Sequence, residues 1–112
     1  MTHAFGTIVL AHFPFTDSSG TKLRPALVIP RDNNRRSDLV LAFITSTARL
    51  AASPHALEIR PDAANGLKVA SFVRFEKLAT LEPSIVVGRL GRASDAFLRA
   101  AKPVFEGVFG FR

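Results

Sequence analysis

The chain has 112 residues, enough for one domain that we expect to span residues 1–112, and its net charge of +6 attracts polyanions, nucleic acid first and acidic protein segments second. Because it has no cysteine, disulfides, thiolate catalysis and cysteine-based metal sites are excluded. Its three histidines are scattered without metal-ligand spacing, so we expect neither a metal nor another cofactor.

Three strands are predicted in the first part of the chain. The amino terminus has no basic segment followed by a long apolar one, so we expect no signal peptide. Residues 7–13 (TIVLAHF) and 25–29 form strands on either side of a polar loop at 16–23. Residues 39–44 (LVLAFI) read as a central strand covered on both faces, and they are too short for a membrane helix, which needs about 20 residues. We therefore expect a cytoplasmic protein with no membrane partner.

The second half of the chain predicts three more strands and then a helix. A short helical turn within 45–54 precedes strands at 56–59, 69–77 and 85–90. After residue 92 the apolar residues recur at helical spacing, with Ser94 as the N-cap and with Pro103 predicting a kink or a break into two helices. The expected fold class is mainly β (α+β), a small, partly closed antiparallel barrel with a carboxy-terminal helix packed on it.

Three groups of polar residues are candidates for chemistry. Arg74 and Glu76 lie on one face of the strand at 69–77, where a carboxylate and a guanidinium suit phosphodiester cleavage or form an ordinary solvated ion pair. Arg24, held extended by the following proline, is either a surface cation or a side chain that binds a phosphate through two hydrogen bonds of its guanidinium. The hydroxyls of residues 45–47 either cap a turn or hold a phosphate.

The order of these segments resembles the PemK/MazF family of toxins from type II toxin–antitoxin systems. The resemblance runs from Gly6 to about Arg92 and rests on GTIVLAHFPFTDSSGTKLRPALVIP, then LAFITS, VRFEKLATL and GRLGR. It implies a small SH3-like barrel that forms a homodimer and acts as a growth inhibitor. It also implies a metal-independent endoribonuclease that cleaves single-stranded RNA, mRNA included, and a cognate antitoxin that holds the activity off.

The resemblance also assigns roles to residues. Arg24 would stabilise the scissile phosphate, Thr45 would act beside it, Arg74 would serve as general acid or phosphate stabiliser, and Glu76 as general base. The attacking 2′-OH would leave a 2′,3′-cyclic phosphate and a 5′-OH end. Further RNA contacts are expected from four residues: Lys22, Ser46, Lys77 and Asp17.

One departure from the family pattern leaves two questions open. The loop SSGTKL lacks the histidine or glutamate that some members carry, so the general base is either Glu76 or Asp17. The same departure supports an alternative function, in which an inactive small barrel binds RNA or an acidic antitoxin-like peptide without cutting.

Overall fold

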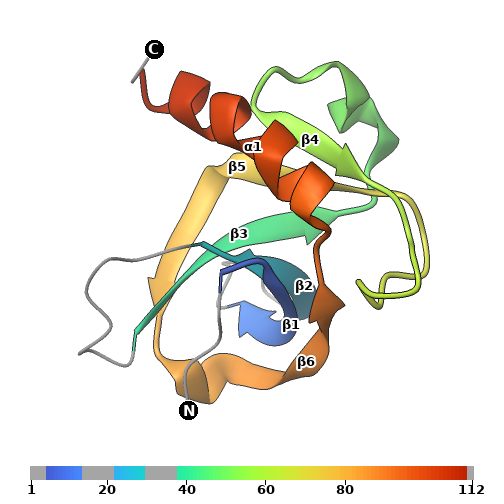
Figure 1. Cartoon of the computed structure of the whole chain (residues 1–112). Helices are drawn as coiled ribbons and strands as arrows, with labels where there is room; N and C mark the ends of the chain where they lie inside the picture. The colour runs from blue at the N-terminus through green and yellow to red at the C-terminus, as the bar shows by residue number, and fades with distance from the viewer. Residues whose placement is uncertain (1–4, 14–21, 30–37, 111–112) are drawn as a thin grey trace.

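The computed structural model describes residues 5–13, 22–29 and 38–110, and these form one six-stranded sheet, two 3-10 turns and one helix (Figure 1). The strands are β1 (Thr7–Phe13), β2 (Lys22–Val28), β3 (Leu39–Thr45), β4 (Ala56–Ile59), β5 (Ser71–Leu81) and β6 (Val86–Arg92). The 3-10 turns η1 (Ala48–Ala52) and η2 (Pro83–Ile85) precede β4 and β6, and helix α1 (Asp95–Val108) ends the described fold.

The sheet is antiparallel in every described pairing and strongly curled. Its strand order is β4-β5-β3-β2-β1-β6, so three strands separate β5 from β6. Only residues 82–85 connect those two strands along the chain. Because so short a connection cannot cross a flat sheet of this width, the sheet must bend round to bring β5 and β6 together. No ladder joins the two edge strands, β4 and β6, within the described ranges, so the barrel is curled but not closed.

Two apolar clusters fill the two faces of the sheet. The first lies beneath α1 and includes Leu27, Ile44 and Phe75, with Phe105 of the helix packed against it. The second lies on the other face and includes Leu41 and Phe43. Successive residues 41–44 of β3 are all buried and alternate between the clusters. This confirms that β3 is a central strand covered on both faces.

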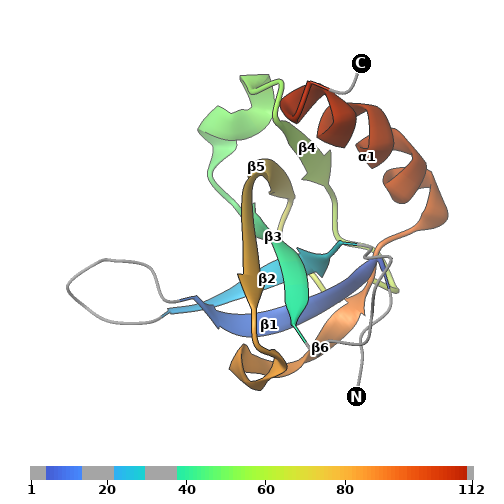
Figure 2. The same cartoon turned by 90° about the vertical axis from the view of Figure 1, so that its left-hand side faces the viewer.

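Helix α1 is one continuous helix that lies beside β4 and β5 in both views (Figures 1 and 2). Its N-cap is Ser94, whose hydroxyl oxygen accepts a hydrogen bond from the backbone N–H of Phe97 at 3.0 Å, as predicted. Pro103 lies inside the helix, so the predicted alternative of two separate helices is wrong. Proline removes one backbone donor, and the packing of Phe105 edge-on against Phe75, at 6.3 Å between ring centroids, holds the carboxy-terminal half in place.

All of the predicted strands and the helix are present, although several strands begin or end at other residues than predicted. β1 and β4 match the predicted ranges, and the helical turn within 45–54 is the 3-10 turn η1. β2 begins three residues earlier than predicted because residues 22–24 pair with β1 although two of them, Lys22 and Arg24, are charged. β5 begins two residues later and ends four residues later than predicted. In the part of the chain that is described, no helix is both long and apolar enough to cross a membrane.

Candidate functional site

Three of the predicted site residues line one cavity. Arg24, Thr45 and Ser46 form part of the wall of a cavity of about 280 Å³, which lies where β2 begins and β3 ends. Arg24 is exposed, and it has no ion pair or side-chain hydrogen bond with another described residue. No described residue therefore competes with an anion for this guanidinium.

Strand register explains why these residues meet. Arg24 pairs with Ala11 of β1, and farther along β2 Ala26 pairs with Phe43 of β3. Continuing that antiparallel register by two residues brings the Arg24 end of β2 beside Thr45, the last residue of β3. Thr45 in turn pairs with Phe72 of β5. The cation and the hydroxyl thus lie at the same end of neighbouring strands.

The Thr45 hydroxyl also belongs to a local turn. Its oxygen lies 3.1 Å from the hydroxyl oxygen of Thr47 and accepts a weak hydrogen bond from the Thr47 backbone N–H at 3.4 Å. The Thr45 hydroxyl therefore caps the turn, one of the two predicted roles, while Thr45 also lines the cavity. Ser46 is exposed.

Another part of the cavity wall comes from the connection between β4 and β5. Gly66, Leu67, Lys68 and Val69 of this segment line the cavity, as does Ser71 at the start of β5. Sequence reasoning placed none of them in the site. The nearest signal is the Asn-Gly pair at 65–66, which marks a tight turn but does not show what the turn packs against.

Arg74 and Glu76 form a close ion pair on β5, as their spacing predicts. Arg74 donates from Nη2 to Oε2 of Glu76 at 2.7 Å and from Nε to the same oxygen at 3.1 Å. The two side chains are 25% and 28% exposed. Arg74 pairs with Phe43 of β3, whereas Thr45 pairs with Phe72, so the ion pair lies farther along the sheet than the Thr45 hydroxyl. Neither member of the pair lines the 280 Å³ cavity.

The environment of Glu76 keeps it ionised. Partial burial acts to raise its pKa, but hydrogen bonds from Arg74 and from the backbone, with electrostatic interactions from Arg74 and His55, outweigh burial and hold the pKa below the ordinary value of 4.5. A carboxylate with a lowered pKa is ready to accept a proton at neutral pH but is a weaker base for doing so. His55 was not identified from the sequence.

The other expected RNA contacts lie outside the cavity wall or outside the described residues. Lys22 is exposed at the start of β2, opposite Phe13, and Lys77 is exposed in β5 where the pairing with β3 is irregular. Asp17, the alternative general base, is outside the described residues. No group of three or more metal-ligating side chains occurs within the described ranges.

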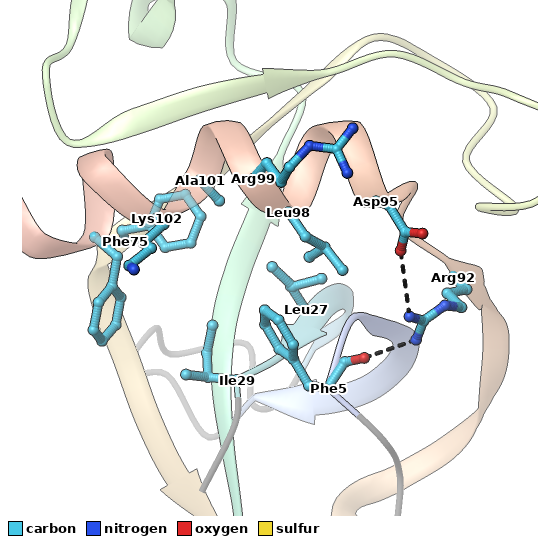
Figure 3. A pocket seen from close by; sticks show the side chains of 11 residues that line it. Phe5, Leu27, Ile29, Phe75, Arg92, Asp95, Leu98, Arg99, Ala101 and Lys102 are labelled. Atoms are coloured by element: carbon cyan, nitrogen blue, oxygen red, sulfur yellow. Dashed lines mark hydrogen bonds and ion pairs between the residues drawn. The ribbon is translucent and has the colours of Figure 1, made fainter.

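A second, larger cavity lies beneath α1 and differs in chemistry. Its volume is about 650 Å³, and its walls include Leu27, Phe75 and Leu98 (Figure 3). Arg92 fixes one side of it by donating to the backbone oxygen of Phe5 at 2.8 Å and pairing with Asp95 at 3.8 Å. No serine or threonine lines it. Cations line both cavities, but the larger one also has the carboxylate of Asp95. The smaller cavity has hydroxyls beside its cations and no acidic residue in its lining, so it is the better candidate for a phosphate-containing ligand.

Comparison with known families gives one match over nearly the whole chain. Residues 4–108 match the sequence model of the PemK-like, MazF-like toxins of type II toxin–antitoxin systems. No curated protein sequence matches the chain significantly.

Among the solved structures that share the fold are three mycobacterial proteins. The Mycobacterium tuberculosis toxin MazF-mt6 superimposes with a TM-score of 0.75 at 22% identity, covering 93% of this chain and 96% of that one. An endoribonuclease in complex with its cognate antitoxin, from a mycobacterial species, has a TM-score of 0.79 at 16% identity, covering 99% and 98% of the two chains. A further mycobacterial endoribonuclease has a TM-score of 0.72 at 17% identity, covering 98% and 93%.

Proposed function

This chain belongs to the family of PemK-like, MazF-like toxins of type II toxin–antitoxin systems, and we propose from that premise that it is an endoribonuclease acting on single-stranded RNA, mRNA included. In the proposed reaction a ribose 2′-oxygen attacks the adjacent phosphorus, and the bond from phosphorus to the 5′-oxygen breaks. A base takes the 2′-OH proton, and the leaving 5′-oxygen gains one. The products are a 2′,3′-cyclic phosphate and a 5′-OH end, and no metal is required.

The cavity that gathers Arg24, Thr45 and Ser46 is the observation that carries this proposal. An exposed arginine without a described partner, held by a strand beside two hydroxyl-bearing residues, suits a phosphate whose charge grows during the reaction. Arg24 is the proposed phosphate clamp. Thr45 and Ser46 are proposed to hold the phosphate oxygens.

The Arg74–Glu76 pair is proposed to complete the site from β5. Glu76 is ionised and can accept the 2′-OH proton, while Arg74 both orients that carboxylate and adds positive charge near the phosphate. Asp17 stays the alternative base. Lys22 and Lys77 are proposed to contact the RNA backbone outside the cavity.

Cleavage of a long single-stranded RNA in EDTA tests the proposal. The wild type should cut it and leave cyclic-phosphate ends, whereas Arg24→Ala should cut about 10²–10³-fold more slowly, the usual effect of losing one donor to a developing oxyanion. The same RNA with 2′-deoxyribose should bind and remain whole, because the nucleophile is missing. Full activity in Arg24→Ala would remove that residue from the site.

A second candidate function rests on the ion pair itself. Because Glu76 is bonded to Arg74 and its pKa is lowered, it is a weakened base. The protein would then bind RNA, or an acidic antitoxin-like peptide, without cutting. Equal RNA binding by the wild type and Glu76→Gln, with no cleavage by either, would favour this function.

Partners and location follow from the family membership as further proposals. We propose that residues 1–112 form a single toxin domain that works as a homodimer in the cytoplasm. A cognate antitoxin with an acidic, flexible segment is proposed to compete with RNA for the positive surface, and its binding should weaken with salt. Light scattering of the purified protein tests the dimer.

A further inference from the structure

The β4–β5 loop, residues 60–70, is a rigid structure built around one buried amide. The side chain of Asn65 is only 1% exposed. Its Oδ1 accepts from the backbone N–H of Leu67 at 2.9 Å and of Asp62 at 3.3 Å, and its Nδ2 donates to the backbone oxygen of Arg60 at 2.8 Å. Asp62 adds two bonds, accepting at Oδ1 from the N–H groups of Ala64 and Asn65, each at 2.8 Å. The loop therefore has a defined shape before any ligand arrives.

Close backbone contact fixes the loop against β6. The backbone N–H of Arg92 donates to the oxygen of Ala64 at 2.9 Å. A Cβ on Gly91 would collide with the backbone of Ala64 and Asn65, and one on Gly66 would collide with the backbone of Leu90. Gly66 also has a φ of +74°, which other residues rarely adopt. The residues that follow Gly66 are therefore held in a fixed position relative to β6.

That place is the wall of the cavity that Arg24 also lines. Lys68 and Val69 are both exposed there, Val69 by 56% although it is apolar. Lys68 has no ion pair or side-chain hydrogen bond with another described residue. Two cations without described partners, Arg24 from β2 and Lys68 from the loop, therefore line the same cavity.

The size of the cavity and the chemistry of its lining suit one nucleotide. The cavity's less exposed walls are mostly apolar side chains, among them Ile44, Leu67 and Leu90, whereas its cations and Ser46 are exposed. A base or ribose can rest on apolar groups while its phosphates stay at the charged rim. At about 280 Å³ the cavity is near the lower end of ligand pockets, which begin at about 300 Å³, so it suits one nucleotide unit rather than several.

We propose that the β4–β5 loop is a preformed nucleotide subsite, in which Lys68 binds the phosphate next to the one held by Arg24 and Val69 contacts the base between them. This rests on the proposed function, because it takes the phosphate at Arg24 as the scissile one. Since the loop is already ordered, little freedom is lost when the nucleotide binds. The loop then helps to set which bases the protein prefers around the cleavage site.

The test measures binding separately from cleavage. The probe is a fluorescent single-stranded DNA copy of the RNA used in the cleavage assay, because DNA lacks the 2′-OH and survives. Its Kd is measured by anisotropy across a salt series for the wild type, Lys68→Ala, Lys68→Arg and Val69→Ser. Lys102→Ala is the matched control, since Lys102 is an exposed lysine on α1 away from this cavity.

Each variant has a distinct expected result. Lys68→Ala should weaken binding by about tenfold and lower the salt slope of log Kd by about 0.7, the contribution of one phosphate contact on a single strand. Lys68→Arg should keep the wild-type slope. Val69→Ser should weaken binding without changing the slope and, in the RNA assay, should broaden the bases found at fragment ends. Lys102→Ala should match the wild type.

The failure of this inference can be told apart from failure of the proposed function. A Lys68→Ala protein with wild-type affinity and slope overturns the subsite, whether or not the wild type cuts RNA. An equal loss of DNA affinity in Lys102→Ala overturns it too, because the effect would then come from the lower net charge of the protein and not from a contact at the loop. A wild type that leaves RNA intact, but binds DNA through Lys68, overturns the nuclease proposal and supports the subsite.

Discussion

Replacing Gly91 with alanine tests how the β4–β5 loop is held against β6. The new Cβ would collide with three backbone atoms: the oxygen of Ala64 and the carbonyl carbon and Cα of Asn65. No side-chain rotation can relieve a clash with backbone, so either the loop moves away or β6 shifts from β1. Gly88 of the same strand provides the matched control, because a Cβ there meets nothing within 4 Å.

The size of the effect follows from the bonds that loop movement breaks. The hydrogen bond from Arg92 N–H to Ala64 oxygen would be lost, at about 0.5–1.5 kcal/mol. Displacing the buried Asn65 amide would leave at least one of its bonds unmade, at about 1–3 kcal/mol. Together these predict a loss of about 2–4 kcal/mol in the free energy of unfolding for Gly91→Ala. Gly88→Ala should be neutral or stabilising by up to about 1 kcal/mol.

Urea unfolding of the three proteins measures this difference, with equal m-values required for the comparison. The anisotropy assay with the single-stranded DNA probe adds a second readout, since displacing the loop also moves Lys68 and Val69. Gly91→Ala should therefore lose affinity for nucleic acid as well as stability. If Gly91→Ala is as stable as Gly88→Ala, the close contact between loop and strand does not exist and the argument for a rigid loop fails.

Two further predictions concern the core and the ion pair. Phe75→Ala should lower the free energy of unfolding by about 3–5 kcal/mol, because Phe75 is 1% exposed, whereas Phe109→Ala, at a position 45% exposed, should lower it by less than about 1 kcal/mol; urea titration compares them. Because the folded-state pKa of Glu76 is lowered, its ionised form stabilises the fold above pH 4.5 and this contribution disappears as the pH falls below it. Glu76→Gln should therefore be less stable than wild type at pH 7, and the gap in melting temperature should close in acid. A gap that persists unchanged in acid would contradict the charge-based explanation.

Much of the fold is predictable because local patterns and tertiary contacts agree. The β-branched run at 7–13 and the short strand at 56–59 match β1 and β4, and the hydroxyl of Ser94 caps the helix that follows it. The ends of β2 and β5 were missed because pairing with neighbouring strands, rather than local composition, decides where they stop. Pro103 stays within α1 because the packing of Phe105 outweighs the loss of one backbone bond.

The candidate site was predictable where a motif marks it and not where distant backbone contacts create it. Arg24, Thr45 and Ser46 occur in segments that resemble a family pattern, and they line one cavity. Lys68 and Val69 have no such signal. Their position depends on two glycines 25 positions apart in the sequence: Gly66, which lies against β6, and Gly91, which lies against the loop. Neither the fit of those glycines nor the burial of Asn65 can be read from residue type alone.

The position of β6 in the sheet has a consequence for the newly synthesised protein. β6 is made after the other five described strands, yet it pairs with β1, the first of them, through contacts such as Thr7 with Arg92. It also supplies Leu90 to the cavity and the backbone against which the β4–β5 loop rests. A chain still being translated therefore lacks a complete cavity until residue 92 has emerged. Because such long-range pairing forms slowly, the cavity is assembled late, only after β6 has been made and has paired with β1.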